Sequence, residues 1–252
     1  MLFKHICADD HSRVVLKGDT KLDYINASYI DNYDTEKAYI ASQGPNKVTI
    51  RDFWHMVWQE NVGKIVMKKC ERYWPNTVNE PMVVNSYIVT MKEYRKHTVY
   101  VYRLLTISNK NVKNVKDREI HHFHFTEWPD HGVPDSIKVV NFYRKVKSKA
   151  CDQLGPMVVH CSAGIGRTGT FIAIDALYEN GKKVGHINVM ECIQMMRKDR
   201  MNMVQTYVGT IVEIPLPQFG GGLQEACIAT DLPFSCFVFI ILNVSIVFIL
   251  YL

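Results

Sequence analysis

The chain has 252 residues, of which 47% are hydrophobic and 22% are charged. This length and composition are ordinary for one globular domain, and they exclude a small disulfide scaffold, a disordered chain and a protein built mainly from membrane-spanning helices. The formal net charge of +5 is compatible with an anionic substrate, a membrane surface or nucleic acid, and charge alone does not choose among them.

The cysteine pattern indicates the compartment. The seven cysteines form no C-x-x-C pair and no set with histidine at zinc spacing, so we expect no metal centre. An odd number cannot all pair within the chain, which favours a reducing compartment. Met1 is followed by no sequence of the kind that directs secretion. We therefore expect a cytoplasmic domain.

The first third of the chain predicts short strands followed by a helix. Residues 24–25 and 38–40 are β-prone runs surrounded by turn residues. The apolar spacing within 50–59 predicts a helix, because apolar side chains recur on one helical face. Gly63 ends this helix, and the apolar run at 64–67 predicts a short buried strand.

The following part mixes strands and helices. The β-rich stretches 82–91 and 97–107, separated by the charged run 92–96, predict an antiparallel pair, and 120–125 predicts another strand. Further patterns predict a strand at 157–160 and helices at 136–148, 167–177 and 189–197. This mixture predicts an α/β (α+β) fold in which helices flank a mixed β-sheet.

The composition changes after Thr206. Every Lys and Arg lies within 1–206, whereas 207–231 contains the prolines and glycines typical of a linker. An uncharged run of 21 residues then begins at Leu232 and ends at Leu252. As a helix rising about 1.5 Å per residue, it would cross a bilayer of about 30 Å. We therefore predict a globular domain over 1–206, a linker and an apolar tail. The tail is either a membrane anchor that leaves the basic domain in the cytosol or a chain end that is not a natural domain segment.

The most informative stretch places Cys161 between a predicted strand and a predicted helix. Gly164 and Gly166 allow successive backbone N–H groups to converge on one centre, where the helix N-terminus adds its positive end. The planar guanidinium of Arg167 grips two oxygens of a phosphate. Such surroundings favour a deprotonated sulfur, so Cys161 is predicted to accept a phosphoryl group, with Thr168 donating its hydroxyl to the sulfur.

A buried structural thiol is the ordinary role of a lone cysteine. Packing alone does not require the order of strand, cysteine, two spaced glycines, arginine and helix that surrounds Cys161. We assign the structural role to the six other cysteines: Cys7, Cys70, Cys151, Cys192, Cys227 and Cys236.

A phosphoester also needs a proton for its leaving oxygen. The segment 126–134 carries Asp130 on a loop bounded by prolines and a glycine, with Trp128 as a bulky anchor. An aspartate in such a turn is usually only a turn former. Together with the cysteine, it becomes the candidate general acid, protonated when substrate arrives and a base toward water afterwards.

At this point the sequence resembles a known family. The blocks HCSAGIGRTG (160–169) and WPDHGVP (128–134) are similar to the cysteine loop and the mobile acid loop of the protein tyrosine phosphatases. Further blocks resemble the family in the same order: DYINASYI (23–30), ASQGP (41–45), FWHMVW (53–58) and KCERYWP (69–75). The resemblance covers residues 3–206 and is closest to the active domain of receptor-type members. It implies a cysteine-based phosphatase fold with a highly twisted mixed sheet.

The resemblance also implies roles for particular residues. Cys161 would be the nucleophile, Arg167 the phosphate binder and Asp130 the acid and base. His160 would tune the sulfur, Thr168 would help to break the phosphocysteine, and Gln205 would position the hydrolytic water. The substrate would meet the aromatic ring of Phe3 and an amide cradle made of Ser162, Ala163, Gly164, Ile165 and Gly166.

Three positions differ from the family pattern. His5 stands where an acidic residue usually holds the substrate backbone, and Gly209 stands where a second glutamine falls. The connection that follows 64–67 is about ten residues shorter than in the family, and this shortening would affect the packing of the neighbouring residues. These differences keep a second function open.

The first interpretation is a phosphatase that hydrolyses phosphotyrosine on proteins through a phosphocysteine, with no metal, cofactor or nucleic acid. The alternative is a catalytically weak phosphatase-like domain that binds phosphotyrosine proteins. A phosphatase of another substrate class is a third interpretation, which the DYINAS block and Phe3 disfavour. The sequence does not indicate an oligomeric state.

Overall fold

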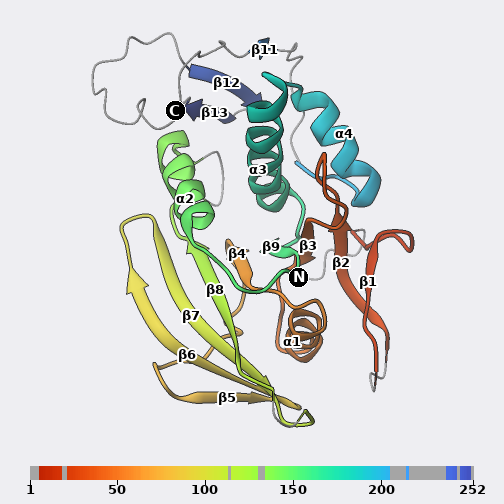
Figure 1. The fold of residues 1–252 in the computed structure, drawn as a ribbon, viewed down its shortest axis with the longest axis vertical. Helices are drawn as coiled ribbons and strands as arrows, with labels where there is room; N and C mark the ends of the chain where they lie inside the picture. Colours follow the sequence, from red (N-terminus) through yellow and green to blue (C-terminus); the bar gives the residue numbers. More distant parts are fainter. Residues whose placement is uncertain are drawn as a thin grey trace.

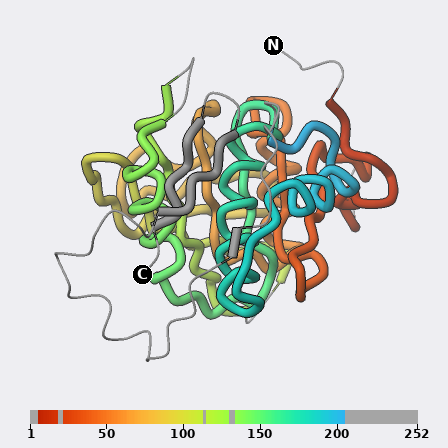
Figure 2. The backbone as a smooth tube through the Cα atoms, turned by 90° about the horizontal axis from the view of Figure 1, so that it is seen from above, coloured from red at the N-terminus to blue at the C-terminus, as the bar shows by residue number. Residues whose placement is uncertain are grey.

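The computed structural model describes residues 6–18, 22–112, 115–129 and 134–204, together with strands at 214–215, 237–242 and 245–250. Nine strands form one mixed sheet (Figure 1). In spatial order they are β1 (Arg13–Val15), β2 (Tyr24–Ile30), β3 (Tyr39–Gln43), β9 (Met157–Cys161), β4 (Lys64–Met67), β8 (Arg118–Phe125), β7 (Tyr100–Asn109), β6 (Tyr87–Lys96) and β5 (Pro81–Val84). Figure 2 shows β1 and β2 in red at one side of the molecule and β6 and β7 in yellow at the other.

Helices cover both faces of this sheet, which gives the domain two apolar cores. α1 (Ile50–Gln59) packs against one face, where Ile65 of β4 lies. On the other face, α2 (Ser136–Ser148), α3 (Gly166–Val184) and α4 (Val189–Asp199) surround the neighbouring Val66 (Figure 1). Successive side chains of a strand point to opposite faces, so β4 contributes to both cores. The predicted mixed sheet flanked by helices is therefore confirmed.

The centre of the sheet is parallel and its edges are antiparallel. β9 pairs in parallel with β3 on one side and with β4 on the other, and β4 pairs in parallel with β8. Cys161 is the last residue of β9. Ligands of such open sheets bind beyond the carboxyl ends of the parallel strands. The topology therefore places the predicted nucleophile where a ligand site is expected.

The helix ends show which sequence signals were sufficient. Asp135 accepts a hydrogen bond from the backbone N–H of Lys138 and caps α2, whose bounds match the predicted 136–148. α3 begins one residue before the predicted 167 and continues through a polar last turn to Val184. Gly185, with φ of 80°, ends it. The apolar pattern alone could not show this longer end.

The predicted pairing of 82–91 with 97–107 is wrong in one respect. The first stretch is itself a hairpin, because Asn85 takes φ of 53° and Val84 pairs with Tyr87 across the turn. β6 then runs through the charged segment 92–96, which was predicted to separate the two strands. Charged side chains are tolerated there because most of this segment is exposed.

The shortened connection after 64–67 leaves the sheet continuous. β4 has four residues and still pairs with both β8 and β9. The chain then turns within Lys68 and Lys69, and Lys69 takes φ of 61°. A left-handed residue replaces the longer strand end, and the sheet order is preserved.

The chain beyond Val204 is described only at short strands. β11 (Ile214–Pro215) pairs with β10 (His186–Ile187), and β12 (Phe237–Leu242) pairs with β13 (Ser245–Leu250). Among the residues that the structure describes, no helix has the length and apolar character needed to cross a membrane. Within the apolar run 232–252, the described parts are the strands β12 and β13. Most of the predicted linker 207–231 and Gly209 lie outside the described residues.

Candidate active site

The Cys161 sulfur sits at the base of a loop that joins β9 to α3. We call residues 161–167 the cysteine loop. The backbone N–H of Gly164 and the hydroxyl of Thr168 both donate to Sγ, each at 3.3 Å. The Cys161 residue is only 5% exposed. Both donors point at one buried sulfur, which places Cys161 Sγ at the centre of the loop.

The backbone of the cysteine loop is closely packed from outside. Gly164 has φ of 73°, and a Cβ at this position would lie 2.2 Å from the carbonyl oxygen of Ser42. The N–H of Gly44 donates to the carbonyl oxygen of Cys161 at 2.7 Å, and the Ser162 hydroxyl donates to the carbonyl oxygen of Lys69 at 3.0 Å. Contacts of this kind fix the direction of the loop peptides.

Arg200 holds two further carbonyl groups of the same loop, and the sequence analysis missed it. Its Nε donates to the Gly164 oxygen at 2.8 Å, and its Nη2 donates to the Ala163 oxygen at 3.2 Å. The remaining bonds go to the side-chain oxygens of Asn26 and Ser28, at 3.0 and 3.2 Å. The C=O and N–H of one trans peptide point in opposite directions, so a carbonyl held outward turns the N–H of the next residue inward. Arg200 thus orients the cradle from behind.

Arg200 is fully buried, yet it keeps its charge at neutral pH. Burial lowers the pKa of this guanidinium to about 10, and a negative Cys161 opposes that lowering. The buried cation therefore lies directly behind the cysteine loop. A charged residue at a helix end is normally solvated and complements the helix dipole. Only the tertiary fold reveals its other role.

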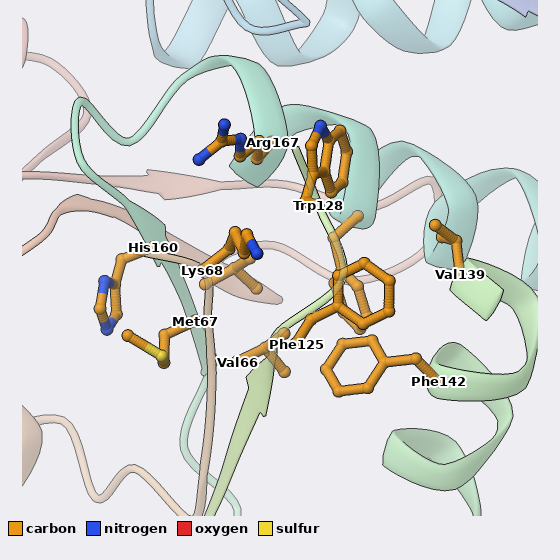
Figure 3. A pocket seen from close by; sticks show the side chains of 11 residues that line it. Val66, Met67, Lys68, Phe125, Trp128, Val139, Phe142, His160 and Arg167 are labelled. Atoms are coloured by element: carbon orange, nitrogen blue, oxygen red, sulfur yellow. The ribbon is translucent and has the colours of Figure 1, made fainter. Parts of the chain in front are cut away.

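Arg167 contacts the described part of the acid loop, 126–134. Its Nη2 donates to the carbonyl oxygen of Pro129 at 2.9 Å, and its guanidinium carbon lies 5.9 Å from the centre of the Trp128 ring. Trp128 also meets Phe125 edge to face. Figure 3 shows Arg167 beside Trp128 at one end of a small cavity of about 30 Å³. The anchor role predicted for Trp128 agrees with these contacts, and Asp130 lies outside the described residues.

Lys68 is a second residue that the sequence analysis did not single out. Its Nζ donates to the carbonyl oxygen of Thr126 at 2.8 Å, and its backbone N–H donates to the carbonyl oxygen of His160 at 3.1 Å. Figure 3 shows the side chain within the cavity between His160 and Phe125. Lys68 therefore links the strand that carries Cys161 to the first residue of the acid loop.

His160 belongs to a buried chain of polar rings. The Tyr73 hydroxyl lies 2.7 Å from Nε2 of His160 and 2.9 Å from Nε2 of His122, so it bridges the two imidazoles. Burial lowers the pKa of His160 to about 3, and burial followed by the nearby Arg103 charge lowers the pKa of His122. Both rings are neutral at pH 7. The His160 ring therefore carries no charge beside the cysteine loop at pH 7.

The structure brings together most, but not all, of the predicted site. Described and adjacent are His160, Cys161, Ser162, Ala163, Gly164, Ile165, Gly166, Arg167 and Thr168. Phe3, His5, Asp130 and Gln205 lie outside the described residues. The described residues contain no cluster of His, Cys, Asp and Glu side chains that could hold a metal ion.

The structural role predicted for the six other cysteines holds only in part. Cys192 is buried, Cys70 and Cys151 are half-buried, and all are free thiols. Cys7 is exposed, so its predicted burial is wrong. Its neighbour Ile6 accepts a hydrogen bond from the side chain of Asn26 in β2 at 2.6 Å. Cys227 and Cys236 lie outside the described residues.

A mixed sheet with a cysteine–arginine loop between its central parallel strand and a helix defines a cysteine-based phosphatase domain. Comparison with known proteins specifies the family. A sequence model of the protein-tyrosine phosphatase family matches residues 3–210. The chain therefore belongs to the protein-tyrosine phosphatase family, a family of phosphoric monoester hydrolases.

Known relatives of the chain include a receptor-type protein. The chain is 40% identical over 223 residues to human receptor-type tyrosine-protein phosphatase zeta, covering 80% of this chain. It is 41% identical over 217 residues to the tyrosine-protein phosphatase Lar-like of Caenorhabditis elegans, covering 81% of this chain. In both cases the alignment spans only 10% of the relative's length. The predicted resemblance to receptor-type members is thus confirmed.

Proposed function

We propose that this domain hydrolyses phosphotyrosine on proteins through a phosphocysteine at Cys161. The observation that carries the proposal is the pair of donors, Gly164 N–H and Thr168 hydroxyl, aimed at the buried sulfur. The carbonyls behind them are held outward by Arg200, which leaves a ring of N–H groups for a phosphate dianion. No step in this scheme requires a metal or a cofactor.

In the first step the deprotonated sulfur attacks phosphorus in line with the tyrosine oxygen. The sulfur–phosphorus bond forms while the bond from phosphorus to the phenolic oxygen breaks, and Asp130 gives its proton to that oxygen. Arg167 and the N–H groups of the cysteine loop bind the three non-bridging oxygens. Tyrosine leaves, and Asp130 becomes a carboxylate.

In the second step water replaces the sulfur. Gln205 positions the water, Asp130 takes one of its protons, and the new oxygen–phosphorus bond forms while the sulfur–phosphorus bond breaks. Thr168 donates its hydroxyl to the departing sulfur, a role supported by its 3.3 Å contact with Sγ. Phosphate leaves and the nucleophile is regenerated. The remaining assignments, Phe3 as the aromatic wall and His160 as a positioning ring, complete the proposed site.

Turnover of p-nitrophenyl phosphate by the purified full chain tests the proposal. We expect nitrophenolate release that Cys161→Ser abolishes and that Cys151→Ser leaves unchanged, since Cys151 lies half-buried outside the site. Phosphotyrosine peptides should be hydrolysed far faster than phosphoserine peptides of the same sequence. Binding of a phosphotyrosine peptide without turnover would instead assign the alternative, a phosphotyrosine-binding domain. Equal rates on both peptides would overturn the substrate class.

The surroundings of the domain are also proposed. The described cysteines are free thiols, which supports a reducing compartment and cytosolic phosphotyrosine proteins as partners. We assign 1–206 as the catalytic domain. Fractionation of cells that express the full chain would place the domain in the cytosol or at a membrane.

A further inference from the structure

Val204 has a backbone conformation that its own side chain disfavours. Its φ is 56°, which a β-branched residue rarely adopts, and its side chain is 1% exposed. Strain of this kind persists only where the surroundings enforce it, and it concentrates at functional sites. The next residue in the chain is Gln205. In the proposed function, Gln205 positions the water that hydrolyses the phosphocysteine.

Arg197 enforces this conformation from the last turn of α4. Its Nε donates to the carbonyl oxygen of Met203 at 2.9 Å, and its Nη2 donates to the carbonyl oxygen of Val204 at 2.8 Å. A planar guanidinium with two fixed donors holds two successive carbonyls in one orientation. The two peptides before Gln205 are therefore clamped.

The same segment is attached directly to the cysteine loop. The N–H of Val204 donates to the carbonyl oxygen of Ile165 at 3.2 Å. Gly169 makes this approach possible, because a Cβ at that position would lie 2.4 Å from the Val204 nitrogen. The strained residue thus touches the loop and the helix that carry Arg167 and Thr168.

We propose that Arg197 is a positioning residue for the second half of the reaction, the hydrolysis of the phosphocysteine. The inference rests on the proposed function. Two arginines have different partners. Arg200 bonds to carbonyls of the cysteine loop, whereas Arg197 bonds to the carbonyls that precede Gln205. Formation of the phosphocysteine uses the loop, Arg167 and Asp130. Arg197 bonds to the carbonyls of Met203 and Val204 instead, so we expect its loss to affect formation less than hydrolysis.

A purely structural role predicts a different result. A basic residue in the last turn stabilises a helix through its dipole, and both Arg197 and Lys198 occupy that turn of α4. Both residues are exposed, so either one can be replaced without leaving a cavity. Lys198→Met is therefore a matched control that removes the same charge without removing the clamp.

The test is the ratio of phosphorylated to free enzyme at steady state with saturating p-nitrophenyl phosphate. Acid quenching followed by mass spectrometry of the intact full chain gives this ratio, which equals the phosphorylation rate divided by the hydrolysis rate. In hydrolysis, water oxygen bonds to phosphorus, the sulfur leaves, and one proton passes to Asp130. We expect Arg197→Met to raise the ratio about tenfold, as the loss of two hydrogen bonds that matter mainly in this step predicts.

Two control variants and the wild-type chain test the role of Arg197 apart from the phosphatase activity itself. Lys198→Met should leave the ratio unchanged, and Arg197→Lys should give an intermediate ratio because its ammonium can still bond one carbonyl. An unchanged ratio in Arg197→Met, with or without a lower overall rate, would overturn the inference. A wild-type chain that releases no nitrophenolate would instead refute the proposed function itself.

Discussion

Arg200 donates from Nε to the carbonyl oxygen of Gly164 at 2.8 Å, across 36 positions of sequence. The bond is part of a set in which one buried guanidinium meets only carbonyl, amide and hydroxyl oxygens. The charge is therefore not neutralised by the groups to which Arg200 bonds, and it acts on the cysteine loop as a whole. The shape of the cysteine loop therefore depends on Arg200, which lies outside the loop, as well as on the loop residues themselves.

Replacement of Arg200 should weaken oxyanion binding more than it weakens the fold. We expect Arg200→Lys, which keeps the charge but loses the fork, to reduce vanadate affinity at least about tenfold, because two loop carbonyls are released. Calorimetric titration with vanadate measures this change, and thermal unfolding checks that the variant is folded. Unchanged vanadate affinity in a folded variant would contradict the role of Arg200.

Replacement of the proposed general acid, Asp130, should slow the chemical step without weakening anion binding. Asp130→Ala is expected to lower kcat by about a hundredfold or more, the usual contribution of a general acid, while vanadate affinity stays within about twofold. In the proposed mechanism Asp130 transfers protons and does not bind the anion. Asp135→Ala is a suitable control, since that carboxylate caps α2. Unchanged turnover by Asp130→Ala at acidic to neutral pH would remove Asp130 from the mechanism.

The glycine in the cradle should tolerate no side chain. In Gly164→Ala the new Cβ would lie 2.2 Å from the Ser42 oxygen at a positive φ, so we expect a loss of about 3 kcal/mol or more in unfolding free energy. Gly18→Ala is the matched control, because Gly18 also has a positive φ but has open space around it. It should cost only about 1–2 kcal/mol. Urea unfolding of both variants gives the comparison, and equal losses would show that contact with Ser42 is unimportant.

The buried imidazoles should make the fold sensitive to acid. Burial lowers the pKa of His160 to about 3 and places that of His122 well below its ordinary value of 6.5. Below pH 6.5 the imidazoles of the unfolded chain therefore bind protons, whereas those of the folded domain do not. The free energy of unfolding falls as the pH falls. The slope from each ring is about 1.4 kcal/mol per pH unit while only the unfolded form is protonated.

Urea unfolding between pH 7.5 and pH 5 measures this loss. His160→Gln should flatten the pH dependence, even if it lowers stability at pH 7.5, because it removes one of the protons taken up on unfolding. Replacement of the exposed His186 by glutamine is the control for removing a histidine outside the buried chain. A wild-type stability that does not change over this range would contradict a neutral His160–Tyr73–His122 chain.

Local signals were sufficient for the cysteine loop and for α2. The residues from His160 to Thr168 are contiguous, so their place between a strand and a helix could be predicted from one stretch of sequence. Asp135 marked the start of α2 by its cap. The turn at Asn85 was missed because it interrupts a run that is β-prone on both sides. The connection between Arg200 and Gly164 could not be predicted, because a basic residue at a helix end has an ordinary local explanation.

The order of the chain gives the Arg200 contacts a consequence during synthesis. A protein is made from its amino end, and the cysteine emerges before the arginine that holds its loop in shape. The cysteine loop therefore gains its bonds to Arg200 only after α4 has been completed and docked. Any property of the loop that depends on these bonds is acquired only by the finished domain.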